Sequence, residues 1–264
     1  MKKILLAAAL ILTMAAGQAS AFTVTGPATQ PVTMFVTGVT TTFPLTASTV
    51  DTWGIFQVTS LISNTTSETV WSSSSTDHLY GAIWGLVDAP SSTTSPYQVQ
   101  KGQFAIFESA TNKYIDLLSS SDAINGNPLL ALNTLFGSTS VLNGNFAPDV
   151  IPDTVTGTTM VTNSSAQFTP ASGDGKAYLN VTDPTSPTAG TQNAQFDSNL
   201  QNGGSDLFFE FSFNTRNVPS GWGANIASAS INGTVVPEPG TMALLGFGML
   251  GLAIFGKRRM NKEA

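Results

Sequence analysis

The chain has 264 residues, with ten basic and sixteen acidic residues, one histidine and no cysteine. The lack of cysteine excludes a disulfide framework, thiolate nucleophiles and cysteine-based metal sites. The net charge of −6 has the same sign as a phosphate backbone, and the resulting repulsion argues against nucleic-acid binding.

The N-terminus has the three parts of a secretory signal peptide. Residues 1–3 supply a basic start, residues 4–16 form an apolar run, and Ala19 and Ala21 occupy the small-residue positions of a cleavage site. The apolar run is short for a membrane span, so an uncleaved signal anchor is the less favoured interpretation. We therefore predict that residues 1–21 form a signal peptide, used by the Sec translocon and removed by signal peptidase.

Residues 22–235 form the predicted exported domain, which is long enough for one large β domain or two small ones. Counted to residue 236, this region holds four basic and fourteen acidic residues, a net charge of −10. Ser and Thr dominate it, and short segments rich in β-branched and aromatic residues are separated by Gly and Asn turns. This pattern predicts an all-β fold. We expect an antiparallel β-sandwich, of which a jelly roll is one form.

Five segments have the clearest strand character. Phe209, Phe211 and Phe213 alternate along the chain and therefore place one aromatic face in a core. Residues 53–58 carry apolar side chains in both alternating sets, which predicts a strand buried on both faces. A short helix is expected within Lys113–Phe136. The predicted strands are Val32–Val39, Gly54–Ile62, Leu79–Val87, Gln103–Glu108 and Leu207–Phe213.

Two Ser/Thr/Pro-rich segments, 88–98 and 183–193, are predicted to be surface loops. We interpret the Phe and Trp residues as core residues. Trp71 is the exception that we keep open, because the four serines at 72–75 follow it and could leave it exposed beside a loop.

No segment of the exported region matches a catalytic motif. His78 is the sole imidazole and no serine lies in a Gly-x-Ser-x-Gly sequence, so we interpret His78 as a loop or strand-start residue. Glycoside hydrolysis needs two facing carboxylates. Glu210 lies between Phe209 and Phe211 and is interpreted as a strand residue on the solvent side. We therefore predict no catalytic residue, no cofactor and no enzymatic activity.

Two groups of Asp and Asn residues offer oxygen ligands of the kind that calcium takes. Neither has the spacing of an EF-hand, and turn formation is the favoured interpretation. We therefore predict no metal site. The two groups are Asp149 with Asp153, and Asp174 with Asn180 and Asp183.

The C-terminal segment 236–264 has three parts. The first contains two prolines that fix φ and remove two amide donors, so it stays extended, as a peptidase cleft requires. The second, 241–256, is apolar and uncharged, and we predict a transmembrane helix there that crosses the inner membrane transiently. The third is a basic stop on the cytoplasmic side. The first part is Val236, Pro237, Glu238, Pro239 and Gly240, and the basic stop is Lys257, Arg258 and Arg259.

This arrangement resembles the PEP-CTERM sorting signal of Gram-negative bacteria that make exopolysaccharide. Pro237, Glu238 and Pro239 stand in the motif positions, and Lys257 to Arg259 form the basic end. The resemblance implies that an exosortase, a multi-pass membrane enzyme, recognises the tail, cuts near the motif and releases or transfers the exported region. Proteins with such tails are typically poor in Cys, rich in Ser and Thr, often glycosylated, and associated with biofilm or floc matrix.

Three other kinds of tail fit the sequence less well. A Gram-positive sortase signal requires Leu-Pro-x-Thr-Gly, where this chain has Val-Pro-Glu-Pro-Gly. A GPI signal has no basic stop after its apolar end. An ordinary C-terminal anchor that is never processed is the remaining alternative.

The sorting tail and the polar β-rich body together predict the role of the chain. We expect an exported cell-surface or extracellular-matrix protein with a non-enzymatic part in biofilm, floc or exopolysaccharide association. A carbohydrate-binding module for the cell's own polysaccharide is the alternative. An exported hydrolase is a third, less favoured hypothesis, since no paired catalytic motif is visible.

Overall fold

The structure, a computed structural model, describes residues 30–46, 49–88, 96–151, 156–164, 172–236 and 248–249. All but the last two residues belong to a compact unit, Val24–Val236. The predicted signal peptide 1–21, the motif residues Pro237 to Gly240 and the basic stop lie outside the described residues.

The predicted transmembrane helix over residues 241–256 is not seen, because all of this segment except Gly248 and Met249 lies outside the described residues. No helix among the described residues is long and apolar enough to cross a membrane.

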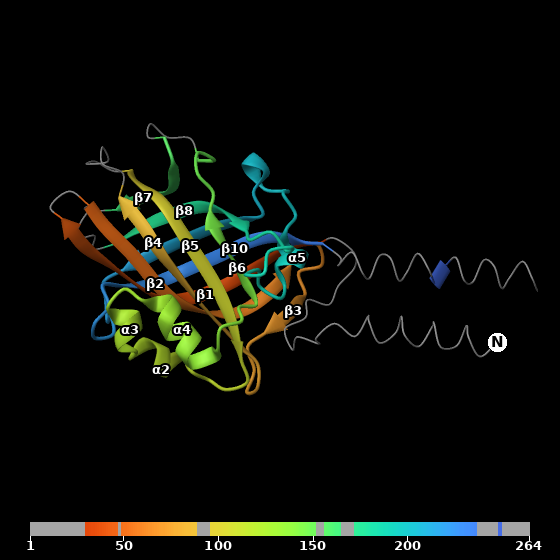
Figure 1. The fold of residues 1–264 in the computed structure, drawn as a ribbon, viewed down its shortest axis with the longest axis horizontal. Coiled ribbons are helices and arrows are strands. Elements are labelled where there is room, and N and C mark those ends of the chain that lie inside the picture. The colour runs from red at the N-terminus through yellow and green to blue at the C-terminus, as the bar shows by residue number, and fades with distance from the viewer. Residues whose placement is uncertain are drawn as a thin grey trace, which may run out of the picture. The chain divides into compact units, whose positions relative to one another are not determined.

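Ten described strands form one antiparallel sheet that closes into a barrel (Figure 1). The ring runs β1-β10-β9-β8-β6-β5-β4-β2, and β2 pairs with β1 to close it. β7 joins β5 to β8 beside β6, and β3 pairs with β2 outside the ring. The strands are β1 (Gln30–Thr46), β2 (Thr49–Ser63), β3 (Thr69–Ser72), β4 (His78–Asp88), β5 (Tyr97–Ser109), β6 (Leu142–Phe146), β7 (Thr158–Ser164), β8 (Ser172–Val181), β9 (Leu207–Asn214) and β10 (Ala224–Val235).

The predicted β-sandwich, jelly roll included, was therefore wrong, although the chain is mostly sheet. The strand β1 pairs with its neighbour in sequence, β2, and also with β10 at the far end of the domain. That second pairing closes the sheet. A bend in β1 assists the closure. The β1–β10 register shifts between Val36 and Gly38, and a Cβ added at Gly38 would collide with the carbonyl oxygen of Ile55. Glycine bends of this kind let a sheet curl into a barrel.

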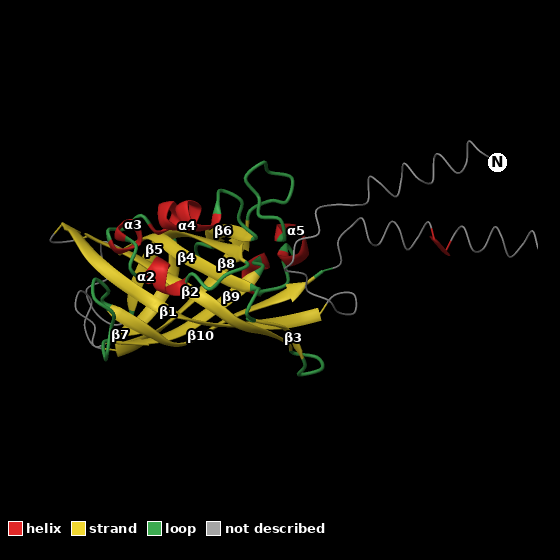
Figure 2. Cartoon of the chain, turned by 90° about the horizontal axis from the view of Figure 1, so that it is seen from below, coloured by secondary structure: helices red, strands yellow, loops and turns green. Residues whose placement is uncertain are grey.

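Three short helices cover the outer side of β2, β4 and β5 (Figures 1 and 2). Their apolar side chains bury the outer face of these strands, while the inner face lines the barrel. The prediction that residues 53–58 are buried on both faces is confirmed, since Trp53 and Ile55 are 5% and 0% exposed and Phe56 and Val58 are 2% and 1% exposed. The helices are α2 (Tyr114–Leu118), α3 (Ser121–Ile124) and α4 (Pro128–Phe136).

These helices are tied to the barrel by two tryptophans. The indole N–H of Trp53 donates to the carbonyl oxygen of Ala123 at 2.9 Å, and that of Trp222 donates to Leu118 at 2.9 Å. Carbonyl groups near the ends of short helices lack partners within the helix, so each bond satisfies an acceptor at a helix end. The helix expected within Lys113–Phe136 is thus present as three short ones.

The five predicted strands are confirmed, each inside a strand with the same or wider bounds. The predicted loop at 183–193 is confirmed up to residue 192, because turns connect β8 to α5 (Asn193–Phe196). Of the other predicted loop, residues 89–95 lie outside the described residues. Its described ends were predicted wrongly, since Asp88 ends β4 and Tyr97 and Gln98 begin β5. A 3-10 turn, η1 (Asn202–Gly204), precedes β9.

Candidate functional site

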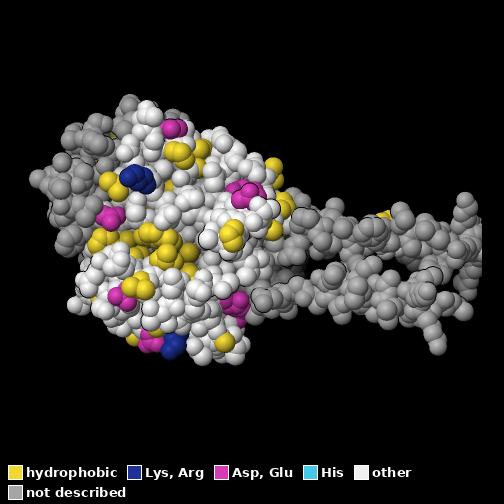
Figure 3. Space-filling model, in the orientation of Figure 1, with side chains coloured by type: hydrophobic (Ala, Val, Ile, Leu, Met, Phe, Trp, Pro, Cys, Tyr) yellow, Lys and Arg dark blue, Asp and Glu magenta, His cyan; other side chains and the backbone are white. Residues whose placement is uncertain are grey.

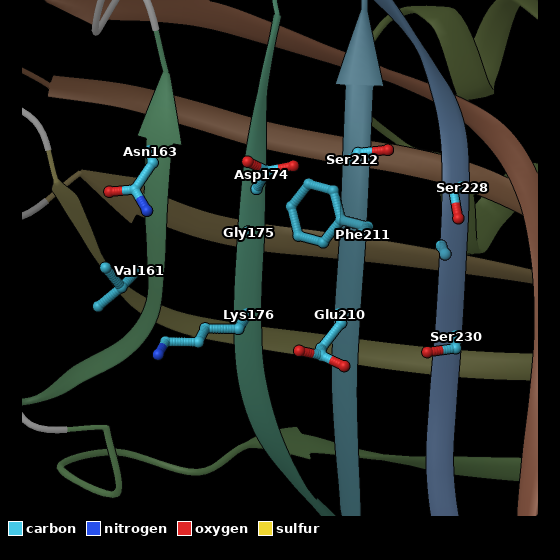
Figure 4. A pocket seen from close by; sticks show the side chains of 11 residues that line it. Val161, Asn163, Asp174, Gly175, Lys176, Glu210, Phe211, Ser212, Ser228 and Ser230 are labelled. Carbon is cyan, nitrogen blue, oxygen red and sulfur yellow. The ribbon is translucent and has the colours of Figure 1, made fainter.

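The outer surface of β7 to β10 carries a shallow pocket of about 400 Å³ (Figure 4). Its lining comes from three rows of residues that run across the strands. Directly opposed residues of neighbouring antiparallel strands lie about 4.5–5.5 Å apart at Cβ and point to the same side of the sheet. The strand register therefore determines which side chains meet in the pocket.

The first row is polar and points outward. Asn163, Asp174, Ser212 and Ser228 stand opposite one another on β7, β8, β9 and β10. Asp174 and Ser228 are exposed. The row therefore presents an amide, a carboxylate and two hydroxyls on one edge of the pocket.

The second row carries the charges. Val161, Lys176, Glu210 and Ser230 are register partners, and Lys176 and Glu210 are both exposed. No ion pair joins these two described side chains, and Figure 4 shows the Lys176 amine turned toward Val161. The ammonium and the carboxylate therefore stay available to a ligand. The interpretation of Glu210 as a solvent-side strand residue is confirmed.

The middle row, Gly175, Phe211 and Ala229, has the opposite orientation, because successive residues of a strand point to opposite faces. The ring of Phe211 lies so close to Gly175 that a Cβ there would collide with it. The rings of Phe209, Phe211 and Phe213 follow one another at centroid distances of 5.0 and 6.1 Å. The predicted aromatic face is confirmed, with Phe209 and Phe213 buried and Phe211 half-buried.

The sole histidine lies elsewhere. His78 begins β4, as interpreted, and its Nδ1 lies 3.0 Å from the hydroxyl oxygen of Ser73. The ring is 7% exposed, and its Nε2 is buried without a hydrogen-bond partner among the described residues. Sequence reasoning missed the Ser73–His78 pair, since only the turn between β3 and β4 brings the two together.

The hypothesis that Trp71 is exposed was wrong. Its side chain is 8% exposed, and the indole N–H donates to a carboxylate oxygen of Asp77 at 2.6 Å. The bond spans the serine-rich turn between β3 and β4. This turn therefore folds back over Trp71 instead of leaving it in solvent.

Asp174 and Asn180, considered above as oxygen ligands, do not converge. They were interpreted as turn residues, but they lie within β8, six residues apart, which is about 20 Å along a strand. Asp183 accepts hydrogen bonds from the backbone N–H and the hydroxyl of Thr185, which lower the pKa of its carboxyl group and confirm it as a turn residue. Asp149 accepts from the Gly157 N–H, and Asp153 lies outside the described residues. Within the described segments, no three His, Asp or Glu side chains are grouped as metal ligands.

The barrel ends where the predicted sorting signal begins. Val235, the last residue of β10, pairs with Gln30 of β1, and Val236 follows directly. Residues 235–259 match a family model described as the PEP-CTERM protein-sorting motif. The chain carries a PEP-CTERM sorting motif. The motif indicates that the chain is an exported protein, directed to exosortase and anchored transiently in the membrane before processing.

The comparisons give no further relative for the body of the chain. Neither the curated proteins nor the solved structures contain a match to it. The role of the barrel ahead of the PEP-CTERM motif therefore has to be argued from its own surface.

Proposed function

We propose that the chain is a non-enzymatic protein of the cell surface or extracellular matrix of a Gram-negative bacterium, acting in biofilm, floc or exopolysaccharide association. The Sec translocon and signal peptidase would export it through residues 1–21, and exosortase would process the tail. The observation that carries the proposal is the PEP-CTERM motif at 235–259, attached without a spacer to a closed barrel.

The surface of the barrel supports this role. Figure 3 shows a face that is largely uncharged and polar, with isolated charged side chains and small apolar patches. The exported region has a net charge of −10, which favours solubility outside the cell. A surface of this kind suits contact with a hydrated, hydroxyl-rich matrix.

Closure of the sheet restricts how the protein can associate. An open sheet offers edge strands that pair with other chains, whereas a closed ring has none. Every strand of this ring pairs on both sides, and β3, which pairs with β2 outside the ring, is an edge of four residues. Association through side chains on the outer surface is therefore favoured over assembly by strand addition.

A genetic experiment tests this proposal. The native host lacking the gene should aggregate less and hold an altered matrix, and the intact gene should restore both. A gene with Pro237, Glu238 and Pro239 all changed to Ala is the matched control, since it keeps the barrel and should not restore them. Unchanged aggregation and matrix composition in the deletion strain would contradict the proposal.

A carbohydrate-binding module is the second candidate, and the pocket on β7 to β10 favours it. Carboxylate, ammonium, amide and hydroxyl groups gather there, which is the composition that orients hydroxyl-bearing ligands. A glycan array probed with the exported protein, with and without calcium, tests this candidate. The absence of binding to every glycan would exclude it.

A further inference from the structure

An aromatic pair borders the pocket on the same outer face. Tyr178 of β8 and Phe208 of β9 are directly opposed, and their ring centroids lie 4.8 Å apart at an interplanar angle of 36°. Each lies two residues along its strand from the charged row of Lys176 and Glu210, so all four side chains point outward. Both rings are half-buried, which leaves part of each exposed.

The row of the aromatic pair continues as amide and hydroxyl groups. Asn232 of β10 stands opposite Phe208, and Thr33 of β1 stands opposite Asn232. The hydroxyl of Thr33 lies 2.6 Å from Oδ1 of Asn232 and 2.9 Å from Oδ1 of Asn64. These contacts hold the amides in place on the surface. The row therefore passes from a flat apolar patch to fixed hydrogen-bonding groups.

The neighbouring row runs parallel to it and ends on another ring. Beyond Glu210 and Ser230 it reaches Phe35 of β1, which is 43% exposed. The two rows together cross four strands, a distance of about 14 Å at the usual strand spacing. This is the length of a short oligosaccharide, with aromatic side chains toward both ends and polar groups between them.

We propose that this face, the glycan platform, binds an uncharged polysaccharide. The platform consists of Lys176, Glu210, Ser230 and Phe35 in one row and Tyr178, Phe208, Asn232 and Thr33 in the other. The C–H face of a sugar ring packs on the electron-rich faces of Tyr178 and Phe208. The amides, hydroxyls and charged groups exchange hydrogen bonds with sugar hydroxyls. The inference rests on the proposed function and adds the ligand class and the surface.

Charge selects the class of polysaccharide. Around the platform, Lys176 stands between two carboxylates, Asp174 and Glu210, in a region whose net charge is −10. A polyanionic chain of uronic acids is repelled by this field. A polycationic chain is attracted by this field through its charge alone, so salt should abolish its binding. An uncharged chain is neither repelled nor attracted by the field. Its binding therefore depends on the aromatic pair and the hydrogen-bonding groups, and should depend little on ionic strength.

Affinity electrophoresis of the mature protein, purified from the native host, tests the platform. Gels contain galactomannan, β-glucan, alginate or chitosan, and a fifth contains the uncharged fraction of the host's own matrix. We expect retardation by at least one uncharged polymer and none by alginate. Tyr178→Ala and Phe208→Ala should each weaken binding about fivefold to tenfold. Glu210→Gln should weaken it about threefold, as expected for one hydrogen bond.

Ile115→Ala is the matched control, because Ile115 is an exposed apolar residue of α2, remote from the platform, and should leave binding unchanged. Thermal unfolding confirms that each variant is folded, and Glu210→Gln at an exposed position keeps the test valid if an aromatic variant does not fold. Binding to alginate alone, or folded variants with unchanged affinity, would overturn the inference. Those results leave the matrix role standing, whereas an unaffected deletion strain contradicts the matrix role itself.

Discussion

The backbone N–H of Val236 donates a hydrogen bond to the carbonyl oxygen of Gln195 at 2.7 Å. Val236 is the last residue before the Pro237-Glu238-Pro239 motif, and Gln195 belongs to α5. The fold of the barrel therefore extends to the residue next to the first proline. The exosortase has to act on a segment that follows the folded domain directly.

The first prediction concerns the motif. Changing Glu238 to Ala, or both Pro237 and Pro239 to Ala, should stop processing, because the extended form and the recognised side chain are lost. A C-terminal epitope tag followed in membrane fractions should show the uncut precursor accumulating. Lys262→Ala is the matched control, since it lies beyond the matched residues 235–259, and it should be processed normally. Normal loss of the tag from the motif variants would contradict the prediction.

The second prediction concerns the tryptophan that ties α3 to the barrel. Trp53→Phe removes the bond to Ala123 and leaves a small cavity, so the free energy of unfolding should fall by about 2 kcal/mol. Urea unfolding measures it. Trp84→Phe is the matched control, because the half-buried Trp84 indole also donates at 2.9 Å, to the Gln103 side chain, through a bond that is exposed to solvent. The free energy of unfolding of the Trp84→Phe variant should fall by less than about 1 kcal/mol. Equal losses would refute the role given to Trp53.

The third prediction concerns a close contact inside the barrel. A Cβ at Gly81 would collide with the ring of Phe56, its register partner on β2. Gly81→Ala should lower the free energy of unfolding by about 3 kcal/mol, as overpacking does. In a double-mutant cycle with Phe56→Leu, which makes room, the two losses should be less than additive. Strict additivity would show that the two residues do not compete for the same space.

The fourth prediction concerns pH. Asp206 is 3% exposed, and burial raises the pKa of its carboxyl group although the backbone N–H groups of Val181 and Asn199 donate to it at 2.9 and 2.8 Å. The folded state then binds a proton more tightly than the unfolded chain does. Stability from this group is present at low pH and is lost as pH rises from the ordinary value of 3.8 through the raised pKa.

Urea unfolding across this pH range should therefore show a free energy of unfolding that falls as pH rises. Asp206→Asn should make this fall smaller. The control is Asp183→Asn, because the pKa of Asp183 is lowered by its bonds to Thr185. That group contributes in the opposite sense, adding stability as pH rises. An unchanged pH profile in Asp206→Asn would contradict the assignment.

The strands that could be predicted are those with large apolar residues in alternation. Phe209 and Phe213 marked β9 in this way. The strands β8 and β10 gave no such signal, because their inward residues include Gly175, Ala177 and Ala229. These small residues leave room for the phenylalanines of β9, so the barrel has a packed core although two of its strands lack bulk.

Closure and the pocket could not be predicted for a related reason. An inward-apolar, outward-polar strand looks the same in a sandwich and in a barrel. Only the pairing of β1 with β10 distinguishes them, and it joins the two ends of the domain. Lys176 and Glu210 likewise meet through the register of β8 and β9, which the sequence does not encode locally. The sorting motif could be predicted because its residues are contiguous.

The central claim is that an exported barrel loses its PEP-CTERM tail to exosortase. Intact-mass spectrometry of the protein from the native host, with and without its exosortase, measures this directly. We predict a mature chain that begins at Phe22 and ends at or shortly after Val236, plus the mass of any attached sugar, and a membrane-bound form retaining the tail when exosortase is missing. A mature surface protein that still contains Lys257, Arg258 and Arg259 in cells with active exosortase would contradict the account.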